Sequence, residues 1–209
     1  MNYPPPPWTL EGYGFLNLHW LDIERARSLI PSEFQVISVY PGKTVGGVFI
    51  TSYKPGSVMP YNELIVVSGC VLYQGKPGAW ISHIYVDNSD SVAGGRAIWG
   101  LPKELAQFEW SFAEQPQVKV SQGDRTLCSL TCHWRSPGLP LPPIEAPVFS
   151  TLNAVPLLFK ASGSFNLQWI NASLHVPDES PFASLKLGQG WLSFYSDRFS
   201  LEAGIPSKM

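Results

Sequence analysis

The chain reads SDSVAGGRAIWGLPK from Ser89 to Lys103, and this stretch decides how the rest of the sequence is interpreted. We expect a helix from Ser89 to Trp99, because Ser89 or Asp90 can cap its start. Gly100 and the proline two residues later cannot continue a helix, so the chain turns sharply just before the lysine. The pattern predicts a helix, an abrupt stop and then a lysine at a defined position.

Two adjacent glycines, Gly94 and Gly95, lie in the middle of this helix. In a helix interior a glycine costs about 1 kcal/mol relative to alanine. The sequence therefore predicts that another part of the chain packs closely against the helix at these two positions.

The rest of the chain is divided by 20 prolines and 18 glycines into short segments that are apolar or alternate in polarity, rich in β-branched and aromatic residues. Such segments at short spacing are typical of antiparallel strands. We expect strands at Gly14–Trp20, Phe34–Val39, Val45–Tyr53, Glu63–Tyr73, Trp80–Val86, Gln107–Phe112, Gln117–Ser121, Leu127–Trp134, Asn166–Leu174 and Gly190–Tyr195. The predicted fold class is mainly β (α+β), with a few short helices.

A second helix is expected near the N-terminus, from Ile23 to Ile30, with Asp22 as its N-cap and a proline as its stop. In this helix Arg25 and Arg27 are expected to be exposed.

The segment 136–147 is rich in proline and has two interpretations. It is either a linker between two domains or an extended loop that crosses one barrel. Apolar, strand-like segments lie on both sides and neither half looks self-sufficient. We favour the loop and expect a single domain over residues 1–209.

The amino-acid composition argues against several classes of function. Charged residues make up 14% of the chain and hydrophobic residues 44%, with 8 Trp, 8 Tyr and 11 Phe, which suits a closed barrel or an oligomer. The net charge of -2 and the lack of a basic run make nucleic acid an unfavoured partner. Apolar runs such as 64–67 are too short to span a bilayer. With no secretory pattern at the N-terminus, we expect reduced cysteines at 70, 128 and 132 and a cytoplasmic location.

The stretch Gly95–Leu105 (GRAIWGLPKEL) resembles the signature of the acetoacetate decarboxylase-like superfamily. Segments 84–88, 61–63 and 26–31 resemble its neighbouring strand, its site carboxylate and its early helix. The resemblance covers about residues 11–112. Within the superfamily, Pro7-Trp8 and the segments 45–49, 63–67 and 100–102 look most like the plant proteins named for neoxanthin deficiency.

The resemblance implies a cone-shaped antiparallel barrel around an apolar cavity, usually in a homo-oligomer, and no metal or organic cofactor. It also implies that Lys103 attacks a substrate carbonyl to form an imine, which acts as an electron sink for a lyase reaction. A free lysine titrates near pKa ~10.4, so a nucleophilic lysine needs desolvation or a nearby cation. Acetoacetate decarboxylase is itself the standard example of this activation, so the mechanism comes with the resemblance.

The sequence departs from the family at three positions. Glu104 replaces the family's second lysine, and a carboxylate close to Lys103 would hold the amine in its charged form. The family's early arginine falls near Trp20, and its second site glutamate falls near Val48. A pocket without that arginine lacks the cation expected to bind a β-keto acid, so acetoacetate is not the expected substrate.

The candidate catalytic residues are Lys103, as the imine-forming nucleophile, and Glu63. Glu63 has two possible roles, as an acid/base group or as a structural acceptor for backbone or for Arg96. The candidate substrate-binding residues are Trp20, Val48, Trp99 and Arg96, although Arg96 also suits a role in tying its helix to the barrel. The histidines at 19, 83, 133 and 175 have no metal-site spacing, and no metal is expected.

Two functions follow from these residues. The first is a cofactor-free lyase that uses a Schiff-base lysine on a carbonyl compound. The second is a non-catalytic protein that binds an apolar, isoprenoid- or carotenoid-like ligand in the same cavity.

Overall fold

The computed structural model describes residues 3–113 and 115–209. Its strands are β1 (Trp8–Asp22), β2 (Gln35–Val36), β3 (Lys43–Tyr53), β4 (Tyr61–Tyr73), β5 (Lys76–Val86), β6 (Lys103–Leu105), β7 (Gln107–Ser111), β8 (Gln117–Gln122), β9 (Arg125–Arg135), β10 (Leu139–Pro140), β11 (Ile144–Leu152), β12 (Val155–His175), β13 (Leu192–Ala203) and β14 (Ser207–Lys208). Its helices are α1 (Ile23–Arg27), α2 (Ser89–Trp99) and the 3-10 turn η1 (Ala183–Leu185).

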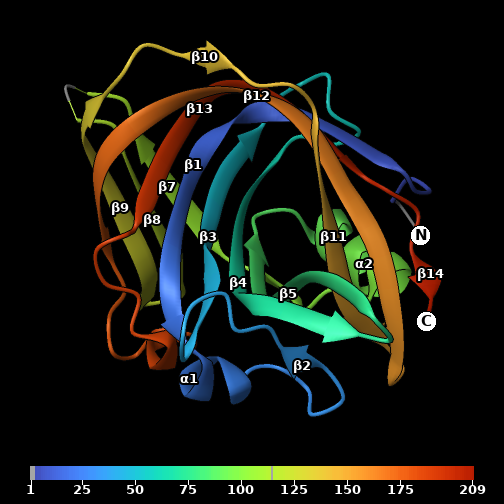
Figure 1. Ribbon diagram of the computed structural model, residues 1–209. Helices are drawn as coiled ribbons and strands as arrows, with labels where there is room; N and C mark the ends of the chain where they lie inside the picture. The colour runs from blue at the N-terminus through green and yellow to red at the C-terminus, as the bar shows by residue number, and fades with distance from the viewer. Residues whose placement is uncertain (1–2, 114) are drawn as a thin grey trace.

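Seven of these strands form a closed barrel. The hydrogen-bonded order runs β11-β5-β4-β3-β1-β13-β12, and β11 also pairs with β12, which closes the ring (Figure 1). The ring pairs are antiparallel except for a short parallel contact between β11 and β5. The mainly β, acetoacetate decarboxylase-like fold class expected from the sequence is confirmed.

A second layer covers part of the barrel's outer surface. The long strand β12 leaves the barrel and pairs through its C-terminal part with β9, which continues to β8 and β7 (Figure 1). One apolar core fills the space between this layer and the barrel wall, and includes Phe15, Ile50, Leu64 and Leu130.

The other main core lies inside the barrel. It takes one or more side chains from each barrel strand and adds Trp99 from α2. Because side chains alternate along a strand, neighbouring residues contribute to opposite cores. Glu63 thus faces the barrel interior, while Leu64 packs in the outer core.

The proline-rich segment 136–147 runs along β12. Its β10 pairs with β12, and β11 begins at Ile144 and continues the pairing. No helix in the described residues has the length and apolarity needed to cross a bilayer.

Two local predictions for the first helix were wrong. The helix ends at Arg27, and the guanidinium of Arg27 is part-buried and donates to the backbone carbonyls of Ile30, Pro31 and Phe34. Asp22 occupies the N-cap position as predicted, but its carboxylate makes no cap hydrogen bond and pairs with Lys43 at 2.6 Å.

Candidate functional site

The end of α2 places Lys103 inside the barrel, next to Trp8 at the start of β1. Gly100 adopts a left-handed conformation (φ 62°), and the backbone N–H groups of Gly100 and Leu101 donate to carbonyls in the last turn. A side chain at Gly100 would also lie 2.2 Å from the carbonyl oxygen of Thr151 in β11. The sharp stop predicted from the sequence therefore joins the helix to the barrel and directs the chain into β6, which begins at Lys103.

The two helix glycines allow the close packing that the sequence predicted. A Cβ atom at Gly94 would lie 2.6 Å from the ring of Trp8, and one at Gly95 would lie 2.5 Å from Cδ of Lys103. The side chain of Lys103 therefore passes directly over the backbone of α2.

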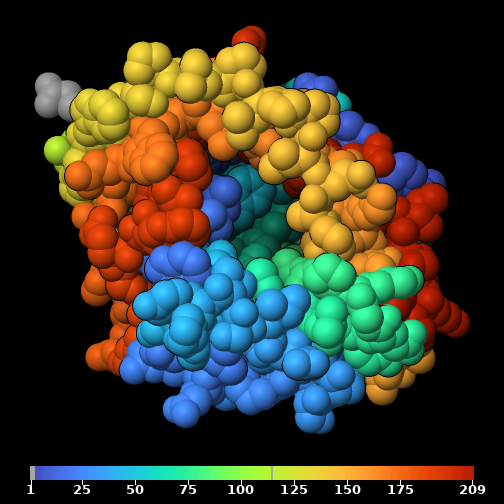
Figure 2. Space-filling view, in the orientation of Figure 1, coloured from blue at the N-terminus to red at the C-terminus, as the bar shows by residue number. Residues whose placement is uncertain are grey.

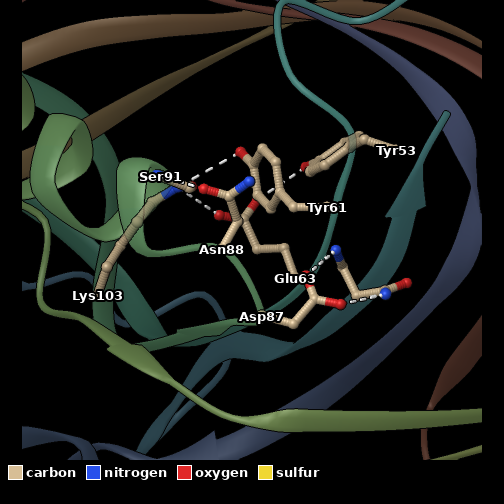
Figure 3. Close-up of polar contacts among 8 residues, drawn as sticks. Tyr53, Tyr61, Glu63, Asp87, Asn88, Ser91 and Lys103 are labelled. Carbon is tan, nitrogen blue, oxygen red and sulfur yellow. Dashed lines mark hydrogen bonds and ion pairs between the residues drawn. The ribbon is translucent and has the colours of Figure 1, made fainter. Parts of the chain in front are cut away.

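The amine of Lys103 is buried and has three polar partners. It lies 2.7 Å from Oε1 of Glu63, and it donates to the hydroxyls of Ser91 at 3.0 Å and Tyr61 at 3.4 Å (Figure 3). The side chains of Lys103 and Glu63 are 4% and 5% exposed. The ion pair is therefore removed from water, and each charge depends on the other for stabilisation.

The second oxygen of Glu63 accepts a hydrogen bond from the hydroxyl of Tyr53 at 2.8 Å. Burial, with the nearby Glu63 charge, raises the pKa of both Tyr53 and Tyr61 well above the usual value for tyrosine. Both phenols consequently remain protonated at neutral pH, so Tyr53 remains a hydrogen-bond donor to the carboxylate.

A small apolar cavity of about 80 Å³ adjoins this cluster. Trp8 and Trp99 form part of its wall and meet edge to face, with ring centroids 4.8 Å apart. A larger cavity of about 240 Å³ lies next to it in the barrel, lined almost entirely by apolar side chains. Figure 2 shows a deep hollow in the molecule, bordered by the yellow chain around β10 and β11 and by the green chain between β4 and β5.

Two of the predicted substrate-binding residues lie next to Lys103. Trp99 lines the small cavity and donates through its indole N–H to the carbonyl of Gly204 at 2.8 Å. Arg96 donates through Nε to the backbone carbonyl of Lys103 at 2.7 Å, so it ties the helix to β6.

The other two lie away from the lysine. Val48 packs in the outer core, because it alternates with Phe49, which faces the larger cavity. Trp20 is 39% exposed and packs against Trp191, with the two rings tilted and their centroids 4.6 Å apart. It lies on the same face of β1 as the cavity-lining Leu16, four residues farther along the strand.

Glu104, which follows the lysine, points away from the site. Its side chain is exposed and accepts a hydrogen bond from Gln122 in β8 at 2.9 Å. Successive residues of β6 face opposite sides, so the carboxylate that meets Lys103 is that of Glu63.

Sequence reasoning did not assign roles to Tyr53, Tyr61 or Ser91. Tyr61 lies two residues before Glu63 on β4 and so shares its face, and Tyr53 lies directly opposite Tyr61 on β3. Ser91 lies four residues before Gly95, one helical turn away. The sequence shows the alternation along β4 and the helical spacing in α2, but it does not show that β3 pairs with β4.

No group of three or more His, Cys, Asp or Glu side chains that could hold a metal occurs in residues 3–113 and 115–209. The buried histidine, His19, contacts Asn17 instead.

The structure is a closed, mainly antiparallel β-barrel with a buried lysine beside an apolar cavity. The family model for acetoacetate decarboxylase (ADC) matches residues 2–155, and the chain belongs to this family. The family prediction made from residues 95–105 is thereby confirmed.

Curated relatives include two kinds of protein. Protein NEOXANTHIN-DEFICIENT 1 of Solanum lycopersicum is 31% identical over 127 residues, which cover 61% of this chain and 43% of that protein. An acetoacetate decarboxylase of Ralstonia nicotianae is 32% identical over 108 residues, which cover 50% of this chain and 40% of that enzyme. The chain thus spans less than half the length of these relatives.

Solved structures extend the likeness over the whole chain. The acetoacetate decarboxylase of Legionella pneumophila has a TM-score of 0.79 at 18% identity and covers 100% of this chain and 89% of that one. The enduracididine biosynthesis enzyme MppR, complexed with pyruvate, has a TM-score of 0.77 at 16% identity. The match covers 99% of this chain and 91% of that one. At such low sequence identity the likeness to these structures shows a shared fold alone.

Proposed function

We propose that this protein is a cofactor-free lyase that forms a Schiff base between Lys103 and a carbonyl compound. The observation that carries the proposal is the buried amine of Lys103, which lies 2.7 Å from Glu63 and beside an apolar cavity. Membership of a family that contains decarboxylases supports it.

Glu63 supplies the proton transfers that imine formation requires. Its carboxylate takes a proton from the ammonium group of Lys103, which leaves a neutral amine and a neutral acid. The amine adds to the substrate carbonyl, and the proton on Glu63 then protonates the resulting hydroxyl, which leaves as water. The products are a protonated imine and a carboxylate, again paired in a site with little water.

The protonated imine withdraws electrons from the neighbouring carbon atom. A bond to that carbon can then break with its electron pair delocalised into an enamine, as in decarboxylation, aldol cleavage or dehydration. Ser91 and Tyr61 are placed to hold the nitrogen in position, and Tyr53 to hold the carboxylate. They are positioning residues in this proposal.

Borohydride trapping tests this function. The protein is incubated with a panel of carbonyl compounds near neutral pH, reduced, and examined by intact mass and peptide mapping. We expect a single reduced adduct on Lys103, and no adduct in Lys103→Met, whose unbranched apolar side chain fills a similar space. Exposed Lys160 provides an internal control. Adducts spread over surface lysines, or none at all, would contradict the proposal.

A second candidate is a protein that binds an apolar ligand without catalysis. The larger cavity, lined by side chains such as Leu16, Phe165 and Phe194, favours it. This function predicts that ligand binding survives Lys103→Met but is weakened by Trp20→Glu, which lies on the same face of β1 as the cavity-lining Leu16. Loss of binding in Lys103→Met, with its fold intact, would count against it.

A further inference from the structure

We propose that the ligand of this site is an uncharged carbonyl compound with a long apolar chain, and that β-keto acids are excluded. The carbonyl carbon lies at Lys103 and the chain occupies the larger cavity. This inference rests on the proposed imine chemistry for the position of the carbonyl group.

The two cavities adjoin inside the barrel, and in this proposal the ligand occupies both as one passage. Five side chains line both of them and so mark their junction: Ile65, Ile81, Val148, Ala161 and Leu201. On β1, Leu10 lines the small cavity and Leu16 the larger one. Six residues of an extended strand span about 20 Å, so the passage suits a chain rather than a compact molecule.

The described residues that line the passage offer no unpaired positive charge. Among the described residues that line it, the charged side chains are Lys103 and Glu63, and they pair with each other. Of the described side chains that line the larger cavity, that of Ser196 alone is polar. A substrate carboxylate would enter without a counter-ion, and burying an unpaired carboxylate is strongly unfavourable.

The apolar surface continues beyond the cavity to solvent. Leu18 and Trp20 follow Leu16 on the same face of β1, and the ring of Trp20 packs against that of Trp191, which is 49% exposed. On β12, which pairs with β13 next to β1, Trp169 is 53% exposed and meets the cavity-lining Phe194, with ring centroids 5.5 Å apart. A chain longer than the cavity would therefore lie against exposed indole rings.

Four compounds separate chain length from charge: acetone, acetoacetate, methyl nonyl ketone, and the β-keto acid that carries the same nonyl chain. Each is trapped with borohydride on the full chain, with freshly prepared keto acids and short incubations. We expect methyl nonyl ketone to label Lys103 at concentrations at least about tenfold below those needed for acetone, because each buried methylene adds favourable transfer energy. The long keto acid should label at least about tenfold less than the ketone. Labelling by the keto acids that equals or exceeds that by the matched ketones would overturn the inference.

Displacement of the uncharged fluorescent probe N-phenylnaphthylamine separates this inference from the proposed function. Displacement by methyl nonyl ketone without an adduct on Lys103 would overturn the imine chemistry and support the apolar ligand. Adducts from acetone as efficient as those from the long ketone would support the chemistry and overturn the ligand class.

A pair of variants tests where the chain lies. Ala161→Phe places a ring at the junction of the two cavities, whereas Ala97→Phe places the same ring on the exposed face of α2. We expect Ala161→Phe to weaken labelling by the long ketone at least about tenfold and Ala97→Phe to leave it unchanged. Circular dichroism establishes that both variants fold. Equal labelling by the two folded variants would place the chain elsewhere and overturn the inference.

Discussion

Burying the ion pair between Lys103 and Glu63 costs desolvation free energy, and the two buried charges then stabilise each other strongly. Both side chains are at least 95% buried, so each has lost most of its hydration and relies on its partner and on Ser91, Tyr61 and Tyr53. A pair of this kind exchanges a proton internally without changing the net charge of the cavity. This property is what the proposed chemistry needs, since the amine becomes neutral only when the carboxylate takes its proton.

The stability of the pair can be measured with a double-mutant cycle. Glu63→Gln and Lys103→Met each leave a buried polar group without its charged partner, and each should lower the free energy of unfolding by about 3 kcal/mol. The variant with both substitutions should lose at least about 2 kcal/mol less than the sum, because no unpaired charge remains. Urea denaturation near neutral pH gives the three values. Additive losses would mean that the two groups are not coupled.

At the scale of elements, α2 holds the lysine by its backbone as well as by Ser91. Gly95→Ala adds a methyl group 2.5 Å from Cδ of Lys103, and the flexible side chain must move away from Glu63. We expect trapping of Lys103 to fall at least about tenfold. The free energy of unfolding should fall by less than the ~3 kcal/mol expected when a partner of the ion pair is removed, because alanine is the better helix former by about 1 kcal/mol and offsets part of the loss.

Ala97→Gly is the matched control on the exposed face of α2. It should cost about 1 kcal/mol of stability and leave trapping unchanged. If Gly95→Ala trapped as well as the natural chain, the close contact would have no part in placing the lysine.

The start of α2 provides a second test. The side chain of Asn88 accepts hydrogen bonds from the backbone N–H groups of Asp90 and Ser91, at 2.9 and 3.0 Å. Asn88→Ala should therefore lower the free energy of unfolding by about 1 kcal/mol, whereas Ser89→Ala should be nearly neutral. Thermal or urea unfolding measures both. A larger loss in Ser89→Ala would mean that the cap lies one residue later.

The cap also shows the limits of sequence reasoning at this scale. The bounds of α2 were predicted correctly, but Ser89 or Asp90 was expected as the cap, because all three residue types suit that position. The choice depends on where the backbone turns out of β5, which the residue pattern does not specify. Prolines and polar residues in 139–165 likewise concealed β11 and the first half of β12. Their strand character comes from pairing with each other and with the barrel.

At the scale of the whole molecule, the same barrel strands contribute side chains to the core inside the barrel and to the core outside it. Residues of β1, β3 and β4 alternate between the cavity and the outer core, so a shift of one residue moves a side chain from one to the other. The family resemblance located Lys103 and Glu63, because the motif fixes their positions in the chain. It could not place Val48 or Trp20, because their faces depend on strand register and on the length of β1.

The outer side of this wall contains a buried histidine that makes stability depend on pH. His19 is 3% exposed and contacts Asn17, and burial lowers its pKa to about 4. In the unfolded chain a histidine titrates near ~6.5, so between these two values the unfolded state binds a proton that the folded state refuses. The histidine's contribution is therefore fully present above about pH 6.5 and is lost as the pH falls toward 4.

The size of this effect is on the order of 3 kcal/mol by pH 4. His19→Gln retains a polar group near Asn17 and removes the titration, so its free energy of unfolding should fall much less between about pH 7 and pH 4.5 than that of the natural chain. His133→Gln, at an exposed histidine, should follow the natural chain. Urea denaturation of the three proteins at both pH values makes the comparison. If all three lost the same free energy, protonation of His19 would not be the cause of acid instability, and the carboxylates would have to account for it.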